Sequence, residues 1–182
     1  MKKINFDVDG NVNVNYAKMM NYINQYLSRN DGYTTGGGLG IRKFVPGKYN
    51  FRISSGFSYT YTRSSVNMLA AIQYWGYQHS ANISIYPGAG WEIGTYANYN
   101  WRQKLDQLDR NNTVLMWNTF LKKNLYRNRL SVRIQISDIL GQNAGINRKT
   151  TANQTTETVS QVIGRYWMLS ATWRFMHHSK AE

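Results

Sequence analysis

The sequence predicts an all-β fold, an antiparallel up-and-down transmembrane β-barrel with about eight strands in this chain. Three observations predict it. Apolar and polar residues alternate with a period of two along most of the chain, which is the period of a β-strand. Tryptophan and tyrosine bracket the apolar face of several segments, and short and long connections alternate between them.

The clearest strand is expected at 165–175, close to the C terminus. A transmembrane β-strand needs about 9–11 residues, with apolar side chains facing lipid and aromatic residues at both interfaces. This segment has that length and carries a tryptophan near each end of its apolar face. The residues of that face are Trp167, Leu169, Ala171, Trp173 and Phe175.

Seven further strands are expected from the same period. They lie at 3–16, 35–44, 49–63, 74–86, 91–102, 112–123 and 129–138. The glycine-rich strand at 35–44 has a weak period and is expected to bend or to be approached closely. Long connections are expected at 17–33, 64–73, 103–111 and 139–160, with tight turns elsewhere, such as Pro46-Gly47. Outer-membrane barrels have this asymmetry of short periplasmic turns and long extracellular loops.

Composition limits the alternatives. The 182 residues suit one domain over 1–182, with strands within about 3–175 and a polar tail at 176–182. No run of 18 apolar residues exists, which excludes a helical membrane protein, and the absence of cysteine excludes disulfides and thiolate metal sites. The net charge of +13 is spread along the chain, which disfavours nucleic-acid binding. No apolar segment follows Met1-Lys2-Lys3, so we expect an export signal to have been replaced or the chain to be a piece of something longer.

The positions of charges fit a lipid-facing surface. Charges of outward parity are Lys43, Arg63, Lys123 and Arg165, all near strand ends. A basic residue facing lipid at the midplane costs about 2–4 kcal/mol, falling to about 0–1 kcal/mol near the interface. Charges expected to face the lumen are Asp7, Asp9, Arg52, Glu92, Arg133 and Arg174. The aromatic residues expected at the membrane interfaces are Trp75, Trp91, Trp101, Trp117, Trp167 and Trp173. A soluble sandwich would show the same parity, but the aromatic bracketing and the loop asymmetry count against it.

No catalytic residue, cofactor site or metal site is predicted. His79 and Ser80 are adjacent on a strand and therefore point to opposite faces, so they cannot act as a base and its nucleophile. Asp138 is expected to be an acceptor that anchors a loop, and Glu92 to form a lumenal ion pair with Arg102. His177 and His178 are expected in the solvated tail.

The C-terminal third contains motifs that resemble a known family. These are Asp138-Ile139-Leu140, Gln142-Asn143, Gly164-Arg165-Tyr166, Met168-Leu169-Ser170 and the terminal Trp173-Arg174-Phe175. They resemble the end of the outer-membrane β-barrel family of Bacteroidetes, the barrel part of TonB-dependent receptor-like proteins, and the likeness continues more weakly through PGAGWEIGTYANYNWRQ. The resemblance implies the closing arc of a barrel of about 22 strands around an N-terminal plug. It also implies energy-coupled uptake, and a last strand ending at Phe175 that the barrel-assembly machinery engages. The chain itself contains no plug and no TonB-contact segment.

Two architectures are left open. The inward residues are mostly Asn, Ser, Thr and Gly, which suits a wide or separately filled lumen. A small closed barrel is possible if Arg52, Arg133 and Arg174 pair with Asp7, Asp9 and Glu92 across the interior. In an arc of a larger barrel, other chains must cover the first and last strand edges, because lipid does not tolerate unpaired backbone groups.

The expected role is transport or structure in the bacterial outer membrane, without enzyme activity. The expected partners are the lipid bilayer with its outer-membrane lipids, the barrel-assembly machinery and other chains that cover edges or fill the lumen, and not nucleic acid. Alternatives are a small outer-membrane lipid-modifying enzyme and a soluble basic β-protein that binds anionic polymers.

Overall fold

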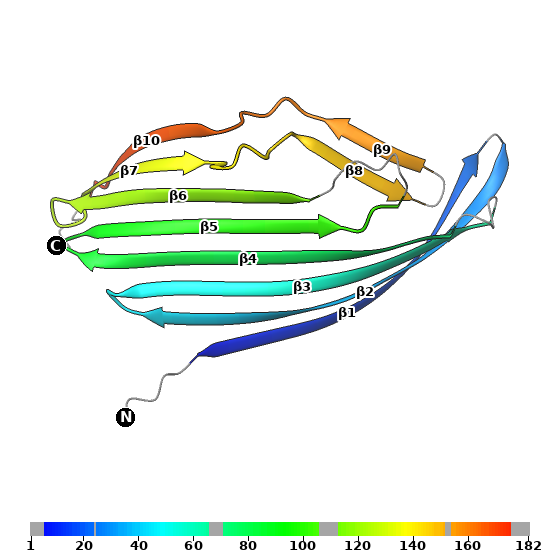
Figure 1. Ribbon diagram of the computed structural model, residues 1–182, viewed down its shortest axis with the longest axis horizontal. Coiled ribbons are helices and arrows are strands. Elements are labelled where there is room, and N and C mark those ends of the chain that lie inside the picture. The colour runs from blue at the N-terminus through cyan, green and yellow to red at the C-terminus, as the bar shows by residue number, and fades with distance from the viewer. Residues whose placement is uncertain (1–5, 24, 66–70, 106–112, 152–153, 176–182) are drawn as a thin grey trace, which may run out of the picture.

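The computed structural model describes residues 6–23, 25–65, 71–105, 113–151 and 154–175. All regular structure in these residues is β-strand (Figure 1). The strands are β1 (Asp7–Ile23), β2 (Tyr26–Val45), β3 (Tyr49–Ser64), β4 (Ile72–Gly88), β5 (Trp91–Arg102), β6 (Val114–Leu125), β7 (Leu130–Ser137), β8 (Ile146–Thr151), β9 (Gln154–Val159) and β10 (Tyr166–Trp173). The predicted start of the first strand at 3–5 and the polar tail, with His177 and His178, lie outside the described residues.

Eight strands form one antiparallel sheet in the order β1-β2-β3-β4-β5-β6-β7-β10, and β8 pairs with β9 in a separate two-stranded sheet. Strands β1 to β7 therefore lie side by side in the order of the chain. β10 pairs with β7, because β8 and β9, which come between them in the sequence, form the small sheet. Aromatic and β-branched residues, which favour pleated backbone, are abundant in these strands. The predicted all-β, antiparallel, up-and-down arrangement is confirmed.

The prediction of a long loop at 17–33 is wrong. Residues 17–23 continue β1 and residues 26–33 continue β2, and the ladder runs unbroken to the pair Ile23 and Tyr26. Gln25, next to the start of β2, has a positive φ of 71°. The hairpin extends beyond β3, because β3 pairs with β2 only as far as Ser64 opposite Asn30.

The three predicted short turns lie at one end of the sheet, where β1 begins and β10 ends (Figure 1). Between β2 and β3, the Lys48 N–H donates to the Val45 carbonyl at 3.0 Å and Gly47 has φ of 69°, the turn expected from Pro46-Gly47. Ala89 and Gly90 join β4 to β5, both with positive φ, as in the two-residue turns that match strand twist.

The long connection predicted at 139–160 contains regular structure. Its middle folds into the β8–β9 hairpin, in which Ile146 pairs with Val159 and Thr151 with Gln154. This hairpin stands apart from the large sheet at the end opposite the short turns (Figure 1). The last strand is also shorter than the predicted 165–175, because regular pairing with β7 stops at Trp173.

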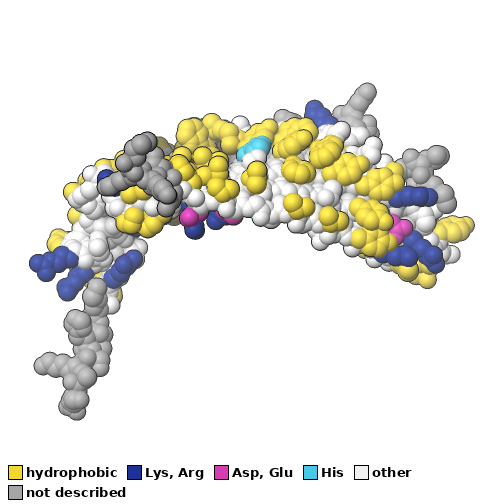
Figure 2. All heavy atoms as spheres, turned by 90° about the horizontal axis from the view of Figure 1, so that it is seen from below, with side chains coloured by type: hydrophobic (Ala, Val, Ile, Leu, Met, Phe, Trp, Pro, Cys, Tyr) yellow, Lys and Arg dark blue, Asp and Glu magenta, His cyan; other side chains and the backbone are white. Residues whose placement is uncertain are grey.

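The large sheet is open. Among the described strands, β1 pairs only with β2 and β10 only with β7, so each leaves one edge without a partner. The small self-closed barrel is therefore not formed, and the arc of a larger barrel is the alternative that agrees with this sheet. In Figure 2 the sheet is arched, with hydrophobic side chains along its convex side.

In the described part of the chain, no second layer packs against the sheet and no apolar core is formed. The largest fully buried side chains among the described residues are Asp138, Ser28 and Ser64, all of them polar. Trp91, Ile93 and Trp173 are 40%, 46% and 48% exposed, so they do not lie inside a globule. In the described part of the chain we find no helix that could cross a membrane.

Candidate functional site: the two faces of the sheet

The outer face is continuous across the sheet, because the strand registers align the apolar positions. Ile53 of β3 pairs with Ala81 of β4, which pairs with Ala97 of β5, which pairs with Trp117 of β6. Paired residues in an antiparallel sheet point to the same side. The apolar sets predicted strand by strand therefore form one surface, and the polar sets form the other.

The first aromatic belt of the outer face lies toward the end of the sheet with long connections. It consists of cross-strand pairs whose ring centroids are 4.9 Å apart in Tyr16–Tyr33, 4.9 Å apart in Tyr59–Trp75 and 5.2 Å apart in Tyr77–Trp101. We call the belt formed by these six residues with Trp117 and Trp167 the upper belt.

The upper belt descends from strand to strand. Tyr33 pairs with Tyr61 of β3, but the next aromatic pair uses Tyr59, two residues nearer the short turns. The next pair uses Tyr77, again two residues nearer the short turns than Trp75 along β4. A belt that runs parallel to the membrane plane moves along each tilted strand in steps of this kind, and strands in a barrel are tilted by about 35–45°. The positions of the aromatic residues therefore fit a tilted barrel wall.

A second belt lies near the short turns. We call it the lower belt, and it comprises Phe6, Tyr49, Phe51, Trp91, Trp173 and Phe175. Lys43 lies 4.6 Å from the ring centroid of Phe6, and Lys123 lies 4.5 Å from that of Trp91. Both lysines were expected near strand ends, and an ammonium over an aromatic face at a membrane interface is a favourable cation–π contact.

The two belts are separated by the thickness of a bilayer core. Trp91 and Trp101 stand at the first and eleventh positions of the 12-residue strand β5, so they lie ten residues apart. At about 3.3 Å per residue and a tilt of about 45°, this spacing crosses about 23 Å, close to the apolar band of about 25 Å of outer-membrane barrels.

Between the belts the outer face is apolar and uncovered. Val12, Leu39 and Leu169 are 84%, 67% and 71% exposed. Soluble monomers rarely expose contiguous apolar patches larger than a few hundred Å². A continuous apolar face over eight strands, bounded by aromatic belts, can be stable in hydrocarbon but not in water.

Three of the predicted lumenal charges, Asp7, Asp9 and Arg52, lie with Arg42 in a cluster on the inner face near the short turns. Arg42 and Arg52 are direct cross-strand partners and each pairs with a carboxylate of β1. Arg42 lies 3.2 Å from Asp7, and Arg52 lies 3.3 Å from Asp9. Asp9 reaches Arg52 across β2 because Gly40 lies between them, and a Cβ there would be 2.7 Å from the Asp9 carboxylate.

The predicted Glu92–Arg102 pair is wrong. Glu92 pairs instead with Lys122, its direct partner on β6, at 3.1 Å. Arg102 lies at the other end of β5, 5.3 Å from the ring centroid of Tyr74. The arginines at 133 and 174 form no ion pair with a carboxylate among the described residues. The Arg133 guanidinium stacks 3.8 Å from the ring centroid of Phe120.

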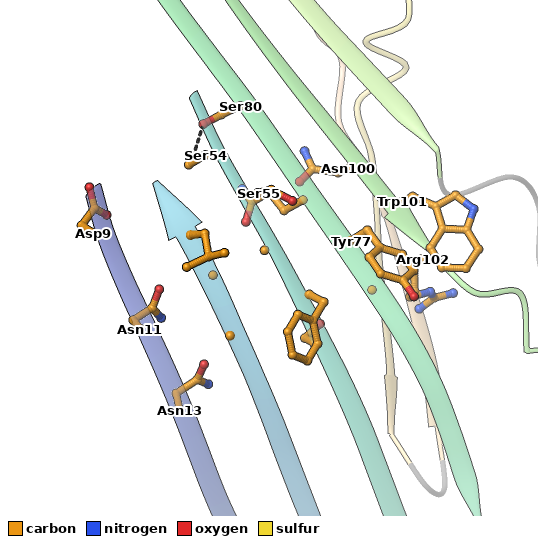
Figure 3. Close-up of a pocket in the computed structure, with 18 of the residues that line it drawn as sticks. Asp9, Asn11, Asn13, Ser54, Ser55, Tyr77, Ser80, Asn100, Trp101 and Arg102 are labelled. Carbon is orange, nitrogen blue, oxygen red and sulfur yellow. Dashed lines mark hydrogen bonds between the residues drawn. The ribbon is translucent and has the colours of Figure 1, made fainter. Parts of the chain in front are cut away.

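An open hollow of about 590 Å³ lies on the inner face of β1 to β5. Its floor is nearly free of side chains, because Gly38 pairs with Gly56 and Ser58 pairs with Gly76. Figure 3 shows one wall of the hollow, a row of polar side chains along β1. The residues that bound it include Asp9, Asn11, Asn13, Ser54, Ser58, Gln78, Ser80, Asn100 and Arg102.

Glycine explains how the floor forms. A Cβ on Gly36 would be 2.7 Å from the Phe57 carbonyl oxygen, and one on Gly76 would be 2.8 Å from the Ser58 hydroxyl. The expectation that the glycine-rich strand is closely approached is therefore confirmed. Ser54 and Ser80 share a hydrogen bond of 2.6 Å across the floor (Figure 3). The surface offers hydroxyl, amide and charged groups to a polar solute and few apolar ones.

His79 and Ser80 lie on opposite faces, as their adjacency predicts. The His79 imidazole stacks on Tyr99 of the outer face, with ring centroids 5.8 Å apart, while the Ser80 hydroxyl bonds to Ser54 on the inner face. The described residues contain no group of three or more side chains suited to holding a metal ion.

Asp138 organises the connection that follows β7. Its carboxylate accepts hydrogen bonds from the N–H groups of Gln142 and Asn143, both at 3.0 Å, and the residue is 2% exposed. The predicted role as a loop-anchoring acceptor is confirmed. The Gln142 side-chain oxygen in turn accepts the Leu115 N–H at 2.9 Å, where β6 has no pairing with β7.

Comparison with known families shows a match along nearly the whole chain. A protein-family model, described as the outer membrane protein beta-barrel family, matches residues 5–173. Searches of curated proteins and of solved structures gave no match.

Proposed function

Because the chain belongs to the outer membrane protein β-barrel family, we propose that it forms one wall of a wide outer-membrane barrel that passes polar solutes. The observation that carries this proposal is the hollow of about 590 Å³ with its glycine and serine floor. The interior of a closed eight-strand barrel is filled by side chains, whereas wide barrels enclose aqueous channels or plugged lumens. The open sheet, and the small side chains at the centre of its inner face, agree with a wide lumen.

In this arrangement the convex face contacts lipid and the concave face contacts water or another protein segment. The Trp91–Trp101 spacing along β5 and the exposure of Val12 and Leu39 between the belts support this orientation. The short turns then face the periplasm and the β8–β9 hairpin faces the exterior, following the usual asymmetry of outer-membrane barrels.

The wall requires further strands. In hydrocarbon, the free edges of β1 and β10 would each leave unpaired backbone groups, at a cost of several kcal/mol per group. We propose that strands of another chain, or of a longer protein that contains this segment, complete the sheet. The resemblance of the C-terminal motifs to TonB-dependent receptor-like proteins of Bacteroidetes favours transport over a purely structural role. It also makes β10 and the residues that follow it to Phe175 the candidate contact of the barrel-assembly machinery.

The proposal includes no chemistry performed by the chain itself. The separation of His79 and Ser80 on opposite faces argues against a lipid-modifying enzyme built on that pair. The family match and the exposed apolar face argue against a soluble protein that binds anionic polymers. Nucleic acid is not among the proposed partners.

The test measures ion conductance of the protein extracted from the outer membrane and reconstituted into planar bilayers. Gly56→Trp adds a large side chain to the floor of the hollow, where a Cβ meets only ordinary contacts of 3.4 Å or more. We expect this variant to lower the unit conductance. The control is Ala81→Trp, which adds the same side chain on the outer face of β4, away from the residues that line the hollow, and should leave conductance unchanged. Absence of conductance in the unmodified protein, or equal conductance in all three proteins, contradicts the proposal.

A further inference from the structure

Above the upper belt, several basic residues lie close together on the outer face of the β1–β2 hairpin and β3. Lys18 pairs with Asp31 across the hairpin, and Asp31 pairs with Arg63 of β3. Arg29 lies two residues from Asp31 along β2 and therefore on the same face. We call Lys18, Arg29 and Arg63 the upper basic cluster, and all three are exposed.

The cluster is compact. Side chains directly opposite each other in an antiparallel sheet have Cβ atoms about 4.5–5.5 Å apart, and residues two apart on a strand are separated by about 7 Å. Both Lys18 and Arg63 therefore flank Asp31 directly, with Arg29 in the next row. The three basic side chains are therefore close enough for one ligand group, or two neighbouring groups of the same ligand, to contact all of them.

The acidic residue of the patch does not neutralise it. The Asp31 carboxylate accepts a hydrogen bond from the Tyr16 hydroxyl at 2.9 Å. Within the described residues, none of the three basic side chains forms an ion pair with a carboxylate. The patch therefore keeps a formal charge of +2, three cations against one carboxylate.

The position of the upper basic cluster along the strands indicates which part of a membrane it would contact. Lys18, Asp31 and Arg63 lie two residues beyond Tyr16, Tyr33 and Tyr61, the aromatic row at the edge of the apolar face. Two residues of a strand tilted by about 45° rise about 5 Å. Tyrosine and tryptophan sit at the level of lipid headgroups, so the next row outward meets headgroup phosphates.

We propose that the upper basic cluster binds the phosphate of a lipid headgroup in the outer leaflet of the outer membrane. Arginine offers planar, bidentate hydrogen bonds to phosphate, and lysine adds a point charge. The partner is thus an anionic, phosphate-bearing lipid, held at the outward side of the β1–β2 hairpin. This contact is independent of the solute path, because it lies on the opposite face of the sheet from the hollow.

The test measures binding of bisphosphorylated lipid A to the full-length protein in zwitterionic detergent micelles, followed by tryptophan fluorescence at low and high salt. The variant Arg29→Gln/Arg63→Gln removes two of the three cations. Each basic side chain near an anionic lipid surface contributes about fivefold to binding, so we expect about 25-fold weaker binding. High salt should lower the lipid A affinity of the unmodified protein toward that of the variant.

The control is Lys48→Gln/Arg127→Gln, which removes two charges from the short turns at the other end of the sheet and should bind lipid A as the unmodified protein does. Circular dichroism establishes that both variants keep their β-sheet. Equal lipid A affinity of the cluster variant and the unmodified protein overturns the proposal. Competition by inorganic phosphate at concentrations equal to those of lipid A also overturns it, because the site would then bind a free anion and not a headgroup.

Discussion

Asp138 shows how one residue determines the path of the chain after β7. It adopts a positive φ of 51°, which aspartate tolerates better than most residues, and its carboxylate accepts two backbone N–H groups in a buried position. Gln142 then supplies the acceptor that β6 lacks at Leu115. These contacts attach the base of the β7–β10 connection, and with it the β8–β9 hairpin, to the upper end of β6.

We expect Asp138→Ala to lower the free energy of unfolding by about 1–3 kcal/mol. The change leaves two part-buried N–H groups without their acceptor and places a Cβ-bearing residue with no polar side chain at positive φ. Guanidinium unfolding in lipid vesicles, followed by tryptophan fluorescence, measures this loss. Asp7→Ala removes a carboxylate from the exposed pair with Arg42 and should cost less than about 1 kcal/mol. Equal losses in both variants would show that Asp138 does not hold the loop.

Sequence reasoning identified single residues better than their partners. The role of Asp138 was predictable because a short acidic side chain at a strand end commonly accepts loop N–H groups. The partner of Glu92 was not, because alternation gives the face of a residue but not the register between strands. In β5 and β6 that register brings Lys122 directly opposite Glu92, whereas Arg102 is ten residues away along the same strand.

The strands were predictable where one face meets an apolar medium. Along β3 and β5 the alternation is strict, and the structure keeps the predicted faces. For the β1–β2 hairpin beyond Tyr16 the sequence predicts a loop, because neither face of the hairpin needs to be apolar above the upper belt and the period of two is therefore lost. Its backbone pairing still continues to Ile23 and Tyr26. The β8–β9 hairpin was missed for the same reason.

The two faces of β5 give a matched prediction. Ala97 lies on the outer face near the midpoint between Trp91 and Trp101, and Asn98 lies beside it on the inner face. Ala97→Arg should destabilise the protein in lipid vesicles by about 2–4 kcal/mol, because it places a cation near the bilayer midplane. Asn98→Arg adds the same charge toward the lumen and should cost far less. Guanidinium titrations of both variants measure the difference, and a larger loss for Asn98→Arg would reverse the assignment of the faces.

At the scale of the whole molecule, the sheet is an arc with two free edges. Sequence reasoning left the small closed barrel and the arc as alternatives, because counting strands does not reveal whether the last one meets the first. Closure depends on strand number, tilt and register together. The bare floor around Gly38 and Gly56 and the absence of ion pairs at Arg133 and Arg174 among the described residues agree with an interior that is not closed over itself.

The open arc predicts a long distance between its edges. Spin labels can be attached at outward positions of the two edge strands through Val12→Cys on β1 and Ala171→Cys on β10. The two labels should be far apart in a single chain, because seven strand spacings of about 4.8 Å separate them along the arc. Pulsed electron paramagnetic resonance in lipid measures this distance. Labels as close as those on adjacent strands within one chain would show that the eight strands close on themselves.

The central claim is that the convex face meets hydrocarbon and the concave face meets water. The chain has no native cysteine, so single cysteines at each position from 92 to 98 on β5 can be spin-labelled and exposed to lipid-soluble oxygen and to a water-soluble nickel complex. The predicted result is a period of two in both accessibilities, out of phase, with oxygen favoured at Ile93, Thr95 and Ala97. Nickel access at these three positions equal to that at their neighbours would contradict the membrane assignment.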